Sequence, residues 1–106
     1  MLAALDFDPS LEIDLLSADL LEPMEMDIAT DGRVFIAERG GKVKLHTPGQ
    51  AGMQVLLDLK SDTRCEGGLM GLEFSPDFDQ TGWIFLYHSV KDPRDADYNI
   101  HQLRRA

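Results

Sequence analysis

The chain has 106 residues, of which 43% are hydrophobic, so it has enough apolar material for one small domain with a modest core. Its formal net charge of −9 argues against nucleic acid and anionic membrane as partners, because phosphate binding requires clustered Lys and Arg side chains. No apolar run has the length of a membrane span, and the single cysteine, Cys65, has no second cysteine with which to form an internal disulfide.

The N-terminal region is acidic. Residues 1–30 contain eight Asp and Glu residues and no Lys or Arg, which is typical of a solvated segment; a docking surface for a basic partner is the alternative. Leu11–Leu15 alternates apolar and acidic residues and predicts a half-buried strand, whereas residues 17–21 fit a short helix or a loop. We expect residues 1–22 to form an acidic segment with a strand that could close a ring of sheets. The start lacks the basic region of a secretory signal, which leaves the compartment unknown.

Strand patterns then follow in two groups. The first group covers residues 24–29, 34–37, 42–46 and 53–59, joined by Gly-containing turns, and predicts one antiparallel four-stranded meander. The second covers residues 69–74, 83–88 and 98–103, and the chain stops at Ala106, where a fourth strand would be expected. No helical pattern intervenes, so a parallel sheet with crossover helices is disfavoured.

The two groups resemble each other in sequence. The distance from Ile28 to Phe74 is 46 residues, and that from Gly32 to Gly82 is 50, which lies in the repeat range of β-propellers. We therefore predict an all-β fold of antiparallel four-stranded meanders, forming about two blades of a β-propeller in residues 23–106, with blade one at about 24–59 and an incomplete blade two at about 69–105. An incomplete ring leaves apolar blade faces uncovered, so the chain is expected to be a fragment or to self-associate.

Three stretches carry a family likeness. Residues 22–45 contain Pro23, then Asp-Gly-Arg, a strand, and Glu38-Arg-Gly-Gly41; residues 66–78 read Glu-Gly-Gly-Leu-Met-Gly and end in Pro-Asp-Phe; residues 82–89 form a strand with Tyr87. Together they resemble the glucose/sorbosone dehydrogenase family of six-bladed propellers, over about residues 20–105. Met70 replaces the second Leu of the family's Gly-Gly-Leu-Leu-Gly pattern.

The resemblance implies a function. Family members oxidise a sugar or another alcohol with pyrroloquinoline quinone (PQQ) and calcium, with a His as general base, and act outside the cytoplasm. The His, the quinone-binding Arg and Lys residues and the calcium ligands follow the region matched here, so we expect an N-terminal part that is inactive alone, with no catalytic residue, no metal ligand and no PQQ or calcium bound. The position that matches a substrate-facing family residue, often Gln, is Glu66. A non-catalytic propeller that serves as a binding module is the alternative.

The best candidate site is therefore Cys65-Glu66-Gly67-Gly68, with Glu66, Gly67 and Gly68 as substrate-binding residues. A tight turn into an inner strand is the plainer interpretation of the Gly pair. We interpret Asp77–Gly82 as a turn and not a calcium loop, and the three histidines as ordinary strand residues. Glu38 and Arg39 are expected in a surface or inter-blade ion pair, with a charged pair at a blade edge near the channel as the alternative. Trp83, Phe85 and Tyr87 are expected in the core of a blade, with a stacking platform as the alternative.

Overall fold

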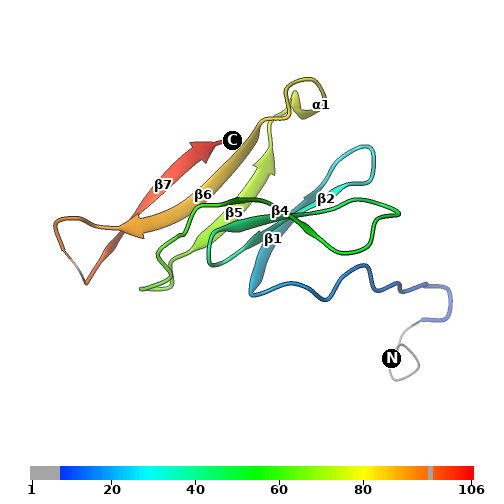
Figure 1. Ribbon diagram of the computed structural model, residues 1–106, viewed down its shortest axis with the longest axis horizontal. Helices are drawn as coiled ribbons and strands as arrows, with labels where there is room; N and C mark the ends of the chain where they lie inside the picture. Colours follow the sequence, from blue (N-terminus) through cyan, green and yellow to red (C-terminus); the bar gives the residue numbers. More distant parts are fainter. Residues whose placement is uncertain (1–7, 96) are drawn as a thin grey trace.

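The computed structural model describes residues 8–95 and 97–106, and the regular secondary structure of these residues is almost entirely β-strand (Figure 1). The elements in chain order are β1 (Pro23–Ile28), β2 (Val34–Glu38), β3 (Lys42–His46), β4 (Gln54–Asp58), β5 (Leu69–Phe74), α1 (Phe78–Thr81), β6 (Ile84–Lys91) and β7 (Asn99–Arg105). No helix in the described ranges is long and apolar enough to cross a membrane.

The first four strands form an antiparallel sheet in the order β1-β2-β3-β4. Within it, Ile36 lies opposite Met26 on β1 and opposite Lys44 on β3, so these three side chains share one face. The connection between β1 and β2 turns at Gly32, whose φ of 89° is in the left-handed region that favours glycine. Asp31 does not have the positive φ that a two-residue Asp-Gly hairpin turn requires. The connection instead runs from the end of β1 at Ile28 to the start of β2 at Val34, and is longer than the tight hairpin that the sequence pattern suggests.

The second sheet has three antiparallel strands in the order β5-β6-β7. The connection from β5 to β6 contains α1, a single helical turn that ends at Gly82 with φ of 70°. The Asp77 carboxylate accepts hydrogen bonds from the hydroxyls of Ser75 and Thr81, which fixes this turn. The expected inter-strand turn at Asp77–Gly82 therefore contains a short helix.

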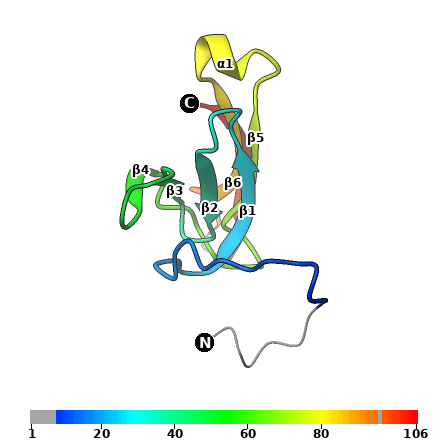
Figure 2. The ribbon, with the colours of Figure 1, turned by 90° about the vertical axis from the view of Figure 1, so that its right-hand side faces the viewer.

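The two sheets pack against each other through one apolar core (Figure 2). An aromatic cluster joins them: the Phe35 ring meets the rings of Phe74 and Phe78 edge-on, with centroids 5.2 and 5.6 Å away, and Phe74 stacks on Phe78. The innermost strands also touch, because the Asp27 carboxylate on β1 accepts the backbone N–H of Phe74 on β5 at 3.2 Å. The buried residues of this core are Ala29, Phe35, Ala37, Val43, Leu45, Leu69, Leu72, Phe78, Ile84 and Leu86.

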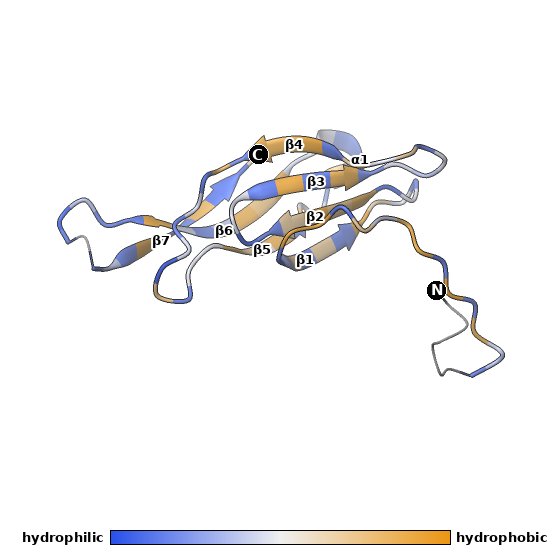
Figure 3. Cartoon of the chain, turned by 60° about the horizontal axis from the view of Figure 1, so that its bottom comes forward, coloured by the Kyte–Doolittle hydropathy of each residue, from blue (hydrophilic) through white to orange (hydrophobic). Residues whose placement is uncertain are grey.

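The N-terminal segment contains no strand in its described part. The prediction of a half-buried strand at Leu11–Leu15 is wrong: Leu11 and Leu15 are 60% and 76% exposed, and no neighbouring strand offers backbone partners to them. Residues 17–21 are a loop and not a helix. In Figure 3 the segment runs in front of β1 and β2, on the side of the first sheet that faces away from the second sheet.

The N-terminal segment is anchored there by a buried ion pair. Glu38 and Lys44 have side chains that are 4% and 9% exposed, and their charged atoms are 3.0 Å apart. The Glu38 carboxylate accepts the backbone N–H of Leu21 at 2.7 Å, and the Lys44 ammonium donates to the backbone carbonyl of Asp19 at 3.0 Å. The pair therefore holds the main chain of residues 19–21 against the sheet, and we call residues 14–21 the strap.

Candidate functional site

The loop between β4 and β5 has an unusual backbone at the predicted site. Cys65 and Glu66 have φ of 53° and 60°, and Gly68 has φ of 137°. Consecutive non-glycine residues in the left-handed region are energetically unfavourable, so surrounding contacts must hold this loop. Such strain gathers at binding and catalytic sites, which makes residues 65–68 a candidate functional site.

Arg39 holds the loop from the first sheet. Its guanidinium donates to the carbonyl oxygens of Gly67 at 3.0 Å and of Thr63 at 2.6 Å, and it pairs with the Glu22 carboxylate at 3.2 Å. A Cβ on Gly68 would lie 2.6 Å from the Arg39 carbonyl oxygen, so only glycine fits at this position. The sheet and the loop are thus in direct main-chain contact, and Leu69 begins β5 by donating its N–H to the same Arg39 carbonyl at 2.8 Å.

Ser89 and Asn99 hold the loop from the second sheet. The Ser89 side chain is buried; its hydroxyl donates to the carbonyl of Asp62 at 2.6 Å and accepts the N–H of Gly68 at 2.7 Å. The Asn99 amide donates to the carbonyl of Arg64 at 2.5 Å. A Cβ on Gly67 would overlap the Ser89 hydroxyl and lie 2.5 Å from the Asn99 amide nitrogen, so Gly67 is required by close packing.

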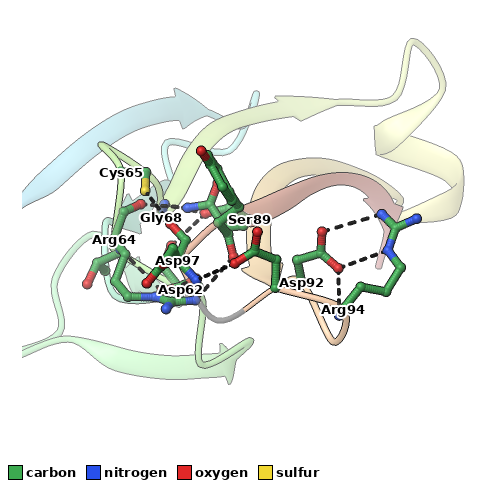
Figure 4. A network of polar contacts seen from close by, with 12 residues as sticks. Asp62, Arg64, Cys65, Gly68, Ser89, Asp92, Arg94 and Asp97 are labelled. Atoms are coloured by element: carbon green, nitrogen blue, oxygen red, sulfur yellow. Dashed lines mark hydrogen bonds and ion pairs between the residues drawn. The ribbon is translucent and has the colours of Figure 1, made fainter.

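A network of polar contacts joins this loop to the connection between β6 and β7, as Figure 4 shows. The Arg64 guanidinium pairs with the Asp62 carboxylate at 2.8 Å and donates to the Tyr98 carbonyl at 3.2 Å, and the Cys65 thiol donates to the Asp97 carbonyl at 3.3 Å. The hydrogen bonds from Arg64 lower the pKa of the Asp62 carboxyl below its ordinary value, so the pair stays ionised at neutral pH. Asp92 forms a similar pair with Arg94 at 3.1 Å.

The effect of this arrangement is to present Glu66 to solvent. The Glu66 side chain is exposed, while the backbone on both sides of it is fixed by Arg39, Ser89 and Asn99. A carboxylate offers two oxygen acceptors, which suits it to bind the vicinal hydroxyl groups of a sugar.

Among the described residues, the arginines have partners and no cluster of metal-ligating side chains is present. The arginines of the described ranges are engaged with acids, carbonyls, His88 or Trp83. Among residues 8–95 and 97–106, no group of three His, Cys, Asp or Glu side chains is placed to hold a metal ion. We therefore derive no chemical step through PQQ or calcium.

Several other residues singled out from the sequence lie elsewhere. The three histidines lie in strands β3, β6 and β7, as expected. Glu38 and Arg39 both form ion pairs, but with different partners, Lys44 and Glu22, and Glu38 is buried under the strap. The aromatic residues at the start of β6 are not in the core. Trp83, which directly precedes the strand, and Phe85 and Tyr87 within it are 38%, 37% and 43% exposed, because the opposite face of β6, with Ile84 and Leu86, packs on the first sheet.

Known structures with the same architecture identify the class of protein. An oxidoreductase from Thermus thermophilus, described as a glucose dehydrogenase, superposes with a TM-score of 0.73 at 27% identity, over 87% of this chain and 26% of that one. The PQQ-bound form of an aldose sugar dehydrogenase from Streptomyces coelicolor superposes with a TM-score of 0.67 at 14% identity, over 86% of this chain and 32% of that one. The predicted fold class is thereby confirmed: an all-β chain whose open antiparallel sheets match part of a propeller-like fold.

The family follows from the sequence match. Residues 20–106 match the family model for glucose / sorbosone dehydrogenase, and the chain belongs to this family, as its motifs predict. No curated protein matches the chain. The chain spans about a quarter to a third of the length of the two solved relatives, 26% and 32%.

Sequence reasoning identified the loop but missed the residues that hold it. Ser89 and Asn99 lie 21 or more residues after Gly68 in the chain, and no local pattern connects them with it. Arg39 lies within the Glu-Arg-Gly-Gly motif, and that motif is the one sequence signal that points to a role beyond the surface ion pair we expected. The assignment of Glu66, Gly67 and Gly68 to substrate binding stays a prediction.

Proposed function

We propose that this chain works within a PQQ-dependent sugar or alcohol dehydrogenase, where the Cys65–Gly68 loop presents Glu66 to the hydroxyl groups of the substrate. The observation that carries the proposal is the strained loop, which three side chains from two sheets hold around an exposed carboxylate. The family and the PQQ-bound relative supply the reaction class and the cofactor; calcium, the sugar substrate and a location outside the cytoplasm belong to the same proposal.

The first test asks whether residues 1–106 turn over a sugar. We expect no turnover when PQQ, calcium, glucose and a dye acceptor are added to this chain, because the resemblance places the family's general base, quinone-binding residues and calcium ligands after the region matched here. Robust dye reduction above that of free PQQ would refute the claim that the catalytic groups lie outside these residues.

The second test asks whether the loop binds a polyol. In a titration of the isotope-labelled chain with glucose, followed by NMR, we expect the amide signals of residues 65–68 to shift, and Glu66→Ala to abolish the shifts. Glu73→Ala, which removes an exposed carboxylate from β5, is the matched control and should leave them unchanged. Shifts that persist in Glu66→Ala would remove Glu66 from the proposed site.

The alternative is a non-catalytic binding module of the same fold. The sequence of a longer polypeptide that contains these residues would distinguish the two functions. A His before a Gly-Gly segment after residue 106, followed by basic quinone-binding positions, would favour the dehydrogenase.

We also propose that the isolated chain associates with itself through an open sheet face, because apolar side chains remain exposed on the second sheet.

A further inference from the structure

The strained backbone of the chain gathers around one turn. Among residues 8–95 and 97–106, the non-glycine residues with positive φ are Glu22, Lys60, Cys65 and Glu66, at 48°, 48°, 53° and 60°. The first precedes β1, and the other three lie in the connection between β4 and β5. Both segments meet the turn between β2 and β3, which carries the Glu-Arg-Gly-Gly motif at residues 38–41. Strain that is gathered in one place must be held by the contacts made there.

The motif binds both segments through its main chain. The Arg39 N–H donates to the Glu22 carbonyl at 2.9 Å. A Cβ on Gly41 would lie 2.7 Å from the backbone nitrogen of Lys60, so the close approach of the second segment requires glycine. The motif is therefore a junction that joins the segment before β1 to the connection that carries Glu66.

The Arg39 guanidinium spans this junction. Its Nη1 pairs with the Glu22 carboxylate at 3.2 Å, while Nε and Nη2 donate to the carbonyl oxygens of Gly67 and Thr63. The guanidinium is planar and rigid, so the carboxylate that orients one of its nitrogens also sets the positions of the other two. Thr63 and Gly67 lie on either side of Glu66 in the sequence, so the two hydrogen bonds fix the main chain before and after it.

We propose that Arg39 and Glu22 are positioning residues for Glu66, and that Glu22, acting through Arg39, sets the affinity of the loop for the hydroxyl groups of the substrate. The inference rests on the proposed role of Glu66 in substrate binding. The clamp acts by preorganisation, because a loop without it relaxes from the left-handed region. The Glu66 carboxylate then samples several positions, and binding has to order it again at a cost in affinity.

Substitutions at Arg39 test the clamp in the 106-residue chain. Arg39→Met keeps an apolar stem against Gly68 and removes all three donors. We expect the glucose dissociation constant, from the NMR titration of the loop amides, to rise roughly tenfold, as for the loss of a hydrogen bond to a charged group. Arg39→Lys keeps the charge but cannot reach three acceptors in one plane, and should give an intermediate value. Arg33→Lys makes the same change in an ion pair of the β1–β2 connection; this matched control should bind glucose as the original chain does.

A second measurement reports on the loop without a ligand. A residue with positive φ has a short distance between its own N–H and Hα protons, and therefore a strong nuclear Overhauser effect (NOE) between them. Cys65 and Glu66 should show this strong NOE in the original chain, and Arg39→Met should weaken it at both residues. A residue that only stabilises the fold would change neither the NOE nor the glucose affinity of the folded molecules.

A double-mutant cycle tests whether Glu22 acts through Arg39. Glu22→Ala should weaken glucose binding roughly threefold, a small effect because the carboxylate forms an exposed ion pair. In the Arg39→Met background the same change should have no further effect, since the guanidinium that Glu22 orients is gone. Glu12→Ala removes a carboxylate from the exposed N-terminal segment and should leave the affinity unchanged in both backgrounds.

The outcomes separate this inference from the proposed function. If glucose moves no loop signal in the original chain, the polyol role of Glu66 fails, and the NOE at Cys65 and Glu66 still decides whether Arg39 positions the loop. If glucose binds but the Arg39 variants match the original chain in affinity and NOE, the inference is overturned and the proposed function stands. Additive effects of Glu22→Ala and Arg39→Met would remove Glu22 from the arrangement. Circular dichroism melts show whether each variant is folded; if Arg39→Met does not fold, Arg39→Lys and Glu22→Ala decide.

Discussion

At the scale of single residues, the site depends on two glycines, Gly67 and Gly68, because neither carries a side chain. Gly67 and Gly68 are packed so closely against Ser89, Asn99 and Arg39 that any side chain would collide with backbone or with buried polar groups. The sequence predicted the importance of the two glycines, but through the general association of Gly pairs with turns. The actual reason is tertiary, and a sequence pattern carries no record of which distant residues approach a glycine.

Gly67→Ala should therefore destabilise the fold, by about 3 kcal/mol, the upper range for overpacking a well-packed site. The matched control is Gly40→Ala, because a Cβ on Gly40 meets nothing within 4 Å and its φ lies outside the positive region. We expect the control to be neutral or slightly stabilising, within about 1 kcal/mol. Urea denaturation measures both, and equal stabilities for the two variants would contradict the packing argument.

His88 is a second residue whose environment fixes its chemistry. Its ring is buried; Nε2 accepts a hydrogen bond from the Arg104 guanidinium at 3.0 Å, and Nδ1 lies 3.0 Å from the Ser61 hydroxyl. Because Arg104 can only donate, Nε2 has no proton and the proton of the neutral ring is on Nδ1. Burial, and secondly the charge of Arg104, lower the pKa of His88 below its ordinary value of 6.5.

The sign of this shift predicts how stability depends on pH. Between the ordinary value of 6.5 and the lower folded value, the unfolded chain binds a proton at His88 and the folded chain does not. The free energy of unfolding should therefore fall as the pH is lowered below about 6.5, and His88→Gln should flatten this dependence. His101→Gln, a change at an exposed histidine on β7, is the control. Thermal melts between neutral pH and about pH 5 measure this pH dependence of stability. If stability depends on pH as steeply in His88→Gln as in the original chain, His88 is not its source.

At the scale of elements, the strands themselves were predictable and the N-terminal segment was not. Alternating residues placed β3 and β5 at their observed bounds, 42–46 and 69–74, since each has turn residues on both sides. Leu11–Leu15 shows a comparable alternation but has no partner strand in this chain. Periodicity indicates that a segment is suited to a sheet, whereas pairing decides whether it joins one.

The strap depends on the buried pair of Glu38 and Lys44, whose charged atoms are 3.0 Å apart. Lys44→Met should cost about 3 kcal/mol, because it leaves the Glu38 carboxylate buried with one backbone donor. Replacing both residues by Met should cost less than Lys44→Met alone, since no uncompensated charge then remains.

Limited proteolysis reports on the strap directly, alongside urea denaturation for stability. Cleavage within residues 14–21 should accelerate in Lys44→Met, whereas Lys42→Met, on an exposed position of the same strand, should leave it unchanged. A cleavage rate that does not respond to Lys44→Met would show that the strap is held by other contacts.

At the scale of the whole molecule, the repeat offset predicted two similar units, and two antiparallel sheets are what the structure contains. Which face of β6 lies inside was not predictable. One face carries Ile84, Leu86 and His88, and the other carries Phe85 and Tyr87 and is continued by Trp83 just before the strand, so both are apolar enough for a core. The choice is made by the first sheet, whose Phe35 and Leu45 share one core with Ile84 and Leu86.

The buried pair beneath the strap has a consequence for how this sequence can change over evolution. Glu38 and Lys44 bind the strap through the N–H of Leu21 and the carbonyl of Asp19, which every non-proline residue provides. The strap's own sequence can therefore drift with little loss of anchoring, while positions 38 and 44 are expected to change together. Among relatives, covariation of these two positions would mark the presence of a strap more dependably than any similarity within the strap itself.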